Sequence, residues 1–242
     1  MKRFVFSIGV ACSLAVLAVT GVFAIGMSVP SAQIPGAPAS VTADYTAVIS
    51  EAMVFLSAQQ LPDGSFDGDE FTTIKVVFAT AAAGRSIASM TSISGHTPLD
   101  FLVTRAITYT HNGNPAGPLN AGRAGMVAAA AVAASADPRN FGGMDLVQAL
   151  GGVYSPTTGA YGAGGTGNQW WAIVGLAAAQ QPVPALATDY LISLQLPDGG
   201  WGWGTLSDAD TTAAVIQALL ASSNVTPTHP IIEEALTFLR NT

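Results

Sequence analysis

The sequence predicts an all-α fold built from about four consecutive pairs of helices and one terminal helix. Apolar residues recur at three- and four-residue steps, and alanine-rich apolar segments alternate with amphipathic ones. No segment shows the alternation of β-branched and polar residues that is typical of a strand. The chain has 242 residues, of which half are hydrophobic and only 10% are charged. This composition supports a sizeable core and excludes a disordered chain.

The first part of the chain is typical of an export signal. Lys2 and Arg3 precede an apolar run from Phe4 to Val29, which contains no charged residue. Residues 1–29 are either a cleaved signal peptide or a retained membrane anchor, since the run is also long enough to span a bilayer. Residues 30–42, rich in Pro, Ala and Ser, indicate a linker. Both interpretations predict a secreted or membrane-anchored domain outside the cytoplasm that contacts the membrane only through its N-terminal segment.

The helices are expected in two alternating kinds. The first helix shows the amphipathic pattern most clearly, because Val48, Ile49, Ala52, Met53 and Leu56 recur at helical spacing. Amphipathic segments predict outer helices over residues 46–59, 99–109, 144–150 and 185–194 and from 231 onward. The alanine-rich segments, which predict the more buried inner helices, cover residues 71–84, 121–136, 168–179 and 210–222.

The loops inside the first and last pairs repeat each other. The segment 55–66 returns as the segment 190–201, with Gln, Leu, Pro, Asp and Gly in register and an aromatic residue at the end of each copy. Pro62 and Pro197 cannot continue a helix, so we expect the outer helices to end before them. The Asp-Gly that follows is typical of a turn. Asp210, Thr211 and Thr212 are expected to cap the last inner helix.

The repeated corner resembles the QW motif of terpene cyclases of the squalene–hopene type and of protein prenyltransferases. The residues that carry the resemblance are Ala52, Phe55, Leu56, Gln60, Gly64 and Phe66, and then Ala187, Tyr190, Leu191, Gln195, Gly199 and Trp201. The resemblance covers residues 43–242 and implies an (α/α) toroid, in which an inner ring of helices lies inside an outer ring around an apolar cavity. We expect the glutamine amide to bond the unpaired carbonyls at the end of the outer helix, and the aromatic residue to pack over the corner.

The C-terminal segment predicts an incomplete ring. Residues 235–239 repeat the beginning of the motif, but the next glutamine would fall beyond Thr242. Complete toroids of the family that the chain resembles use about six helix pairs. We therefore expect either a natively shortened unit or a fragment, with an open edge or an exposed apolar patch.

Asp208-Ala209-Asp210-Thr211-Thr212 resembles the DxDD motif of squalene–hopene-type cyclases. The resemblance implies that Asp210 acts as the general acid and Asp208 as a supporting carboxylate, although Thr211 stands where the motif has its last aspartate. The alternative is that these residues only cap a helix. Ligand contacts are expected from the large aromatic residues of this region, Trp170, Trp171, Trp201 and Trp203.

The sequence predicts no metal site and no cofactor. Cys12, the only cysteine, lies in the leader, and the three histidines lack ligand spacing, which excludes the zinc chemistry of protein prenyltransferases. The acidic loop that begins at Asp63 matches only the first half of a calcium loop, because Ile74 occupies its twelfth position. The net charge of −7 excludes nucleic acid as a partner.

These observations predict an exported binding or cell-surface interaction domain without catalysis. Its partner would be a small apolar or cofactor-sized ligand, or a protein of the cell surface. The alternative function is that of a terpene cyclase that acts through Asp210.

Overall fold

The computed structural model describes residues 45–242. The predicted leader, residues 1–29, and the predicted linker, residues 30–42, lie outside the described residues. Within the described part the fold is mostly helical, as predicted, and comprises nine α-helices, one short 3-10 turn, η3 (Ile87–Ser89), and one small hairpin.

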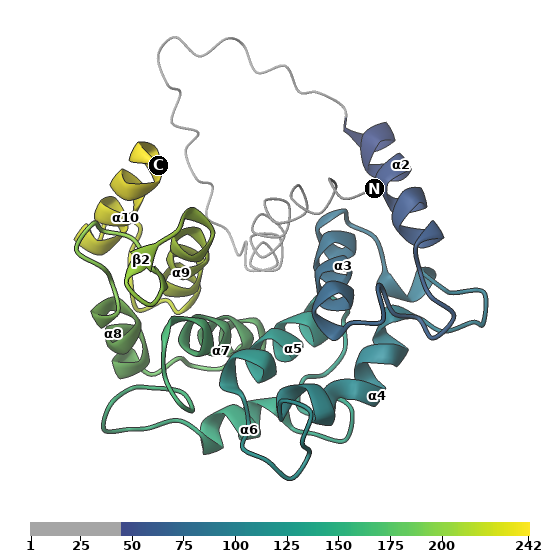
Figure 1. Cartoon of the computed structure of the whole chain (residues 1–242), viewed down its shortest axis with the longest axis horizontal. Helices are drawn as coiled ribbons and strands as arrows, with labels where there is room; N and C mark the ends of the chain where they lie inside the picture. The colour runs from purple at the N-terminus through teal and green to yellow at the C-terminus, as the bar shows by residue number, and fades with distance from the viewer. Residues whose placement is uncertain (1–44) are drawn as a thin grey trace.

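The helices alternate between two layers. Figure 1 shows four helices along the concave side of an arc, namely α3 (Glu70–Ala82), α5 (Ala121–Ala133), α7 (Thr166–Ala178) and α9 (Ala209–Ala221). The convex side carries the other five, α2 (Thr46–Ala58), α4 (Pro98–Thr110), α6 (Leu146–Gly152), α8 (Ala185–Ser193) and α10 (Pro230–Asn241). The predicted pairs of outer and inner helices are confirmed, with boundaries that differ from the prediction by a few residues.

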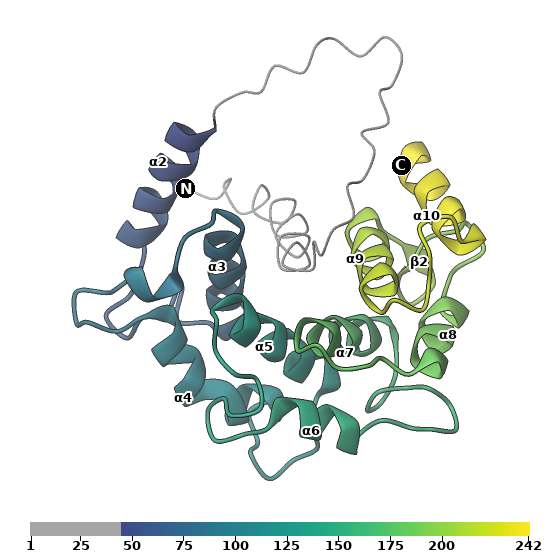
Figure 2. The same ribbon diagram turned by 180° about the vertical axis from the view of Figure 1, so that it is seen from behind.

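The described residues form an open arc. Helices α2 and α3 lie at one end and helices α9 and α10 at the other, and the view from behind shows the same gap between the two ends (Figure 2). The ring that the resemblance implies is therefore not closed within residues 45–242.

One prediction about the corner loops is wrong in detail. The amide Nε2 of Gln60 donates to the carbonyl of Gly64 at 3.1 Å and to that of His96 at 3.3 Å, and Nε2 of Gln195 donates to Gly199 at 2.9 Å. The glutamines therefore tie the loop to itself, and Gln60 also ties it to the entrance of α4. The carbonyls at the end of α2 are instead bonded by backbone N–H groups, such as the bond from Gln59 to Leu56.

Each corner that ends in an aromatic residue uses the same buried hydrogen bond. The backbone N–H of the aromatic residue donates to a buried polar side chain in the first turns of the next inner helix. The pairs are Phe66 with Thr73 at 3.0 Å, Tyr161 with Gln169 at 3.0 Å, and Trp201 with Thr212 at 2.9 Å. A buried N–H needs such a partner, so the corner and the start of the inner helix are fixed together.

A small β-hairpin is the element that the sequence did not predict. Strands β1 (Gly202–Trp203) and β2 (Leu206–Ser207) pair antiparallel, with Gly202 opposite Ser207 and Trp203 opposite Leu206. The hairpin lies between Trp201 and the start of α9. It corrects the expectation of a chain without strands, although only two residues on each side take part.

The inner helices α5 and α7 approach each other at backbone distance. A Cβ atom on Gly125 would collide with the backbone carbonyl of Trp171, and one on Gly175 would collide with the backbone of Gly125. Alanines such as Ala124, Ala128 and Ala130 are fully buried in the same region. Small side chains let the two backbones approach each other, as the alanine-rich pattern indicated.

Candidate functional site

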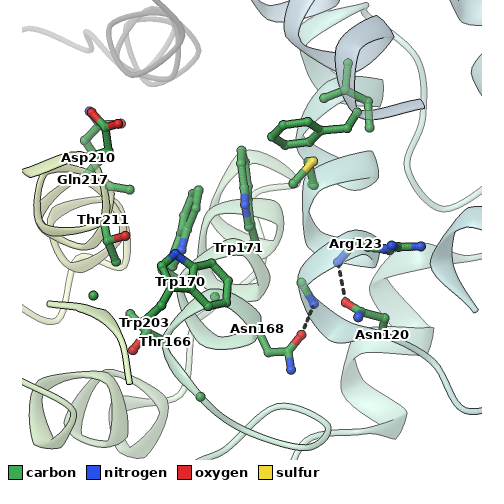
Figure 3. Close-up of a pocket in the computed structure, with 18 of the residues that line it drawn as sticks. Asn120, Arg123, Thr166, Asn168, Trp170, Trp171, Trp203, Asp210, Thr211 and Gln217 are labelled. Carbon is green, nitrogen blue, oxygen red and sulfur yellow. Dashed lines mark hydrogen bonds between the residues drawn. The ribbon is translucent and has the colours of Figure 1, made fainter. Parts of the chain in front are cut away.

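The concave side of the arc contains a cleft of about 970 Å³. All four inner helices contribute to it, together with the glycine-rich loop before α7 and the β-hairpin before α9 (Figure 3). Much of the lining is aromatic or apolar. It includes Phe71, Ile74, Phe78, Met126, Trp170, Trp171 and Trp203.

Two tryptophans of α7 form the centre of this lining. The ring centroids of Trp170 and Trp171 lie 3.9 Å apart, with a tilt of 30° between the planes. Trp171 also lies nearly parallel to Phe78 of α3, at 6.0 Å between centroids and 10° between planes. The contact of Gly125 with the Trp171 carbonyl fixes this part of α7 against α5. The indoles therefore stand on a rigid support.

The other two tryptophans have different environments. Trp203 on β1 lines the cleft, is 75% exposed, and covers Gly167, where a Cβ atom would come within 2.6 Å of its ring. Trp201 is fully buried, and its Nε1 donates to the Leu191 carbonyl at 2.9 Å. Trp201 belongs to the core and is not part of the cleft lining, so of the four predicted ligand contacts the structure brings together Trp170, Trp171 and Trp203.

The structure separates the roles of the two candidate catalytic aspartates. Asp208 is the N-cap of α9, and its carboxylate accepts from the backbone N of Thr211 at 2.7 Å and from the Thr211 hydroxyl at 2.8 Å. Asp210 lies in the first turn of α9, is exposed, and lines the cleft. The expectation that Asp210 caps this helix is therefore wrong, because Asp208 occupies the N-cap position.

The sequence at the start of α9 has a counterpart at the start of α3, and the comparison shows why Asp208 rather than Asp210 is the N-cap. Asp69-Glu70-Phe71-Thr72-Thr73 opens α3 as Asp208-Ala209-Asp210-Thr211-Thr212 opens α9, and Asp69 also caps its helix, through the backbone N of Thr72 at 2.7 Å. In this correspondence Asp208 matches Asp69, and Asp210 matches Phe71. The matching spacing is visible in the sequence and would have identified Asp208 as the cap.

The amide side chains that line the cleft form hydrogen bonds with other groups of the protein. Asn168 accepts from the backbone N of Gly122 at 3.0 Å and donates to the Gly164 carbonyl at 3.0 Å. Asn120 caps α5 by accepting from the backbone N of Arg123 at 2.9 Å. The cleft therefore offers aromatic faces rather than amide hydrogen bonds to a ligand.

Two cations lie on aromatic rings at the α3–α5 side of the cleft. The Lys75 ammonium stands 4.0 Å from the centre of the Phe71 ring, and the Arg123 guanidinium stands 4.7 Å from that of Tyr109. Burial raises the pKa of Tyr109 from its ordinary value to about 12. Phe71 and Tyr109 therefore already have cationic partners within the protein.

The described part of the chain contains no group of three or more His, Cys, Asp or Glu side chains that could hold a metal ion. In the acidic loop, the Asp63 carboxylate accepts hydrogen bonds from Ser65, through its hydroxyl at 2.6 Å and its backbone N at 3.1 Å. Among residues 45–242, no helix is both long and apolar enough to cross a membrane.

No protein-family model matches the chain, and neither the curated proteins nor the solved structures contain a match to it.

Proposed function

We propose that the chain is an exported ligand-binding protein of the (α/α) toroid type, which binds an apolar or cofactor-sized ligand in the concave cleft without catalysis. The observation that carries this proposal is the cleft itself, with Trp170, Trp171 and Trp203 in its lining. Its volume of about 970 Å³ lies in the range of ligand cavities, and such cavities are lined mainly by apolar and aromatic side chains.

The toroid type is supported by the alternation of helices between two layers and by the repeated corners. The corners at Phe66 and Trp201 share the glutamine-to-glycine bond and the bond from the aromatic backbone N–H to a buried threonine. An arc of such units places the inner helices around a common space. The proposal of export depends on the pattern of residues 1–29 alone.

The main alternative is a terpene cyclase in which Asp210 protonates the substrate. The position of Asp210 in the lining of the cleft, which also includes three tryptophans, favours this alternative. Such protonation requires a site that excludes water, whereas Asp210 is exposed and Asp208 serves as a helix cap. We therefore rank catalysis second. Incubation with squalene and with prenyl diphosphates tests it, because a cyclised product that disappears in Asp210→Asn would establish the enzyme.

A protein partner is a further candidate, supported by the outward face of α2. This helix contains no buried residue, and Val48, Val54 and Phe55 are between 62% and 71% exposed. Exposed apolar side chains gathered on one helix are typical of an interaction surface.

Binding to the cleft is tested with the neutral fluorescent probe N-phenylnaphthylamine. We expect saturable binding to the purified protein, with energy transfer from tryptophan, and a loss of affinity of about tenfold in Trp171→Ala because a large aromatic contact is removed. Phe55→Ala on the outer face of α2 is the matched control and is expected to leave cleft binding unchanged. Equal affinities of the wild type and Trp171→Ala would overturn the proposal.

A further inference from the structure

We propose that the ligand of the cleft carries an organic ammonium group, which binds against Trp170, Trp171 and Trp203 next to the carboxylate of Asp210. This inference rests on the proposed binding function and names the chemical class of its ligand. It comes from three features of the cleft: an inserted hairpin, the scarcity of free amide groups, and the position of one carboxylate.

The β-hairpin is an addition to the repeat. In the first unit the corner aromatic Phe66 lies three positions before the cap Asp69, whereas in the last unit Trp201 lies seven positions before Asp208. The additional residues carry Trp203 and Leu206, which are 75% and 77% exposed. Since the first corner closes without such residues, the fold does not require them.

Trp203 nevertheless has a defined place. Its ring lies on the backbone of Gly167, at the start of α7, and it lines the same cleft as Trp170. Because the side chain is 75% exposed, most of its indole is left uncovered by the protein. The inserted hairpin therefore adds a third indole to the tryptophan side of the cleft, where a ligand can contact it.

The polar groups of the cleft limit what this ligand can be. The amide of Asn168 is bonded to Gly122 and Gly164, and the hydroxyl of Thr211 donates to Asp208. A ligand group rich in hydroxyls would find few partners there. A quaternary ammonium group donates no hydrogen bond and is attracted to the faces of aromatic rings, so it suits such a surface.

The charges of the cleft point to the same group. Within residues 45–242, the side chain of Asp210 makes no hydrogen bond or ion pair, and it lines the α9 side of the cleft whose lining also includes the tryptophans (Figure 3). Lys75 and Arg123 lie against Phe71 and Tyr109, away from this side. The α7 and α9 sides of the cleft thus offer aromatic faces and an unpaired negative charge, which is the combination that attracts a cation.

The ligand extends beyond its ammonium group. The cleft volume of about 970 Å³ is several times that of a trimethylammonium group. Its apolar lining also includes Ile74, Met126 and Phe78, and Phe78 stacks on Trp171. We therefore expect an apolar body attached to the cation, bound over these side chains.

The charge is tested with choline and with dimethylbutanol, in which a tert-butyl group replaces the trimethylammonium group of choline. Calorimetric titration of the purified wild type should show choline binding about tenfold more tightly than the neutral isostere. Asp210→Asn should lower choline affinity about fivefold and leave dimethylbutanol nearly unaffected, because it removes only a charge. Trp203→Ala should also lower choline affinity about fivefold, and it should weaken dimethylbutanol by a smaller factor because both ligands lose an aromatic contact. Phe55→Ala should change neither affinity, and thermal melts should show that the variants fold.

The outcomes separate this inference from the function on which it rests. Equal affinities for choline and dimethylbutanol, or choline affinity that is unchanged in both cleft variants, would overturn the ammonium proposal. If N-phenylnaphthylamine still binds in a Trp171-dependent manner, the proposed binding function stands even though the ammonium proposal fails. Hexyltrimethylammonium should bind more tightly than choline, and equal affinities of the two would contradict the apolar body.

Discussion

Gly125 of α5 lies directly against the backbone carbonyl of Trp171 of α7, so the two inner helices approach each other at backbone distance. The same turn of α7 carries Trp170 and Trp171 into the cleft. A packing contact on one side of α7 therefore determines where the aromatic surface lies on the other side. Stability and ligand binding are coupled at this position.

Gly125→Ala is expected to destabilise the protein and to weaken binding. The added methyl group would collide with the Trp171 carbonyl, and α5 and α7 would have to move apart. Overpacking of this kind costs about 1–3 kcal/mol. Urea denaturation measures the loss, and titration with N-phenylnaphthylamine should show weaker binding because both indoles shift.

Gly151→Ala provides the matched control. Gly151 lies in α6, is exposed, and has no atom within 4 Å of the place that a Cβ would occupy. The substitution should stabilise the protein by up to about 1 kcal/mol, since alanine favours a helix over glycine. If Gly125→Ala destabilised the protein no more than Gly151→Ala, this result would contradict the close approach of the α5 and α7 backbones at Gly125.

Asp208 and Asp210 are predicted to contribute differently to stability. Asp208→Ala removes the cap that accepts from the Thr211 backbone N at 2.7 Å, and should cost about 1 kcal/mol. Asp210→Ala removes an exposed side chain without a partner within residues 45–242 and should change the free energy of unfolding by less than about 0.5 kcal/mol. Thermal denaturation of the two variants compares them, and the reverse order would contradict the cap assignment.

The helices could be predicted from the sequence because their signals are local. The alanine-rich run of α5 follows directly from the burial of this helix. In α2 the helical spacing of Val48, Ala52 and Leu56 predicted the helix correctly, although Val48 and Ala52 are exposed. The predicted boundaries differ from the observed ones by a few residues because caps and turns set the ends. Asp208 is an example, since its carboxylate rather than that of Asp210 reaches the free N–H of the first turn.

The cleft was predicted only in part, because its composition depends on how distant segments meet. Trp201 and Trp203 are two positions apart in the same loop. The repeat aligns Trp201 with Phe66 and so predicts a corner residue, but it gives no counterpart for the exposed Trp203. The hairpin that separates them interrupts the repeat, so the first corner gives no template for it. Trp171 of α7 contacts Phe78 of α3. These residues are far apart in the sequence, and the periodicity of each helix does not predict which distant helix it will contact.

Gln169 is predicted to be among the most sensitive polar residues. It is fully buried, accepts from the Tyr161 backbone N at 3.0 Å, and donates to the carbonyls of Gly159 at 2.9 Å and Ala187 at 2.8 Å. Gln169→Leu leaves these three backbone groups unpaired, and each costs about 1–3 kcal/mol. We expect a loss of at least about 3 kcal/mol in urea denaturation.

Gln148→Leu is the control for this substitution. Gln148 is exposed on α6, so the same change should lie within about 0.5 kcal/mol of the wild type. A loss in Gln169→Leu no larger than that in Gln148→Leu would show that the corner at Tyr161 does not depend on the buried amide.

The outward face of α2 is predicted to promote self-association or binding of apolar dyes. Val54 and Phe55 are 71% and 65% exposed on a helix without a buried residue. Replacing both with serine should lower the binding of the dye bis-ANS and the apparent mass in size-exclusion chromatography with light scattering. A wild type that is monomeric and binds no dye outside the cleft would contradict an exposed interaction surface on α2.

Asp198 gives the clearest pH-dependent prediction. The Asp198 carboxylate accepts one hydrogen bond from the Ser207 hydroxyl at 2.7 Å and another from the backbone N of Gly200 at 3.1 Å. These bonds, and the bond from Ser207 above all, lower the pKa of Asp198 below its ordinary value. A carboxyl whose pKa is lower in the folded state stabilises the fold above the pKa of the unfolded chain. That contribution is lost as the pH falls through the folded-state pKa.

Ser207→Ala tests this assignment because it removes the larger of the two causes. The pKa of Asp198, followed by NMR titration of its carboxyl carbon, should rise toward its ordinary value, and the loss of stability on acidification should become smaller. Ser193→Ala is the control, since the Ser193 hydroxyl donates to the Tyr190 carbonyl at 2.7 Å and not to Asp198. Because Ser207 belongs to β2, an Asp198 pKa that is the same in Ser207→Ala and the wild type would mean that the hairpin is not fastened to the corner loop at this point.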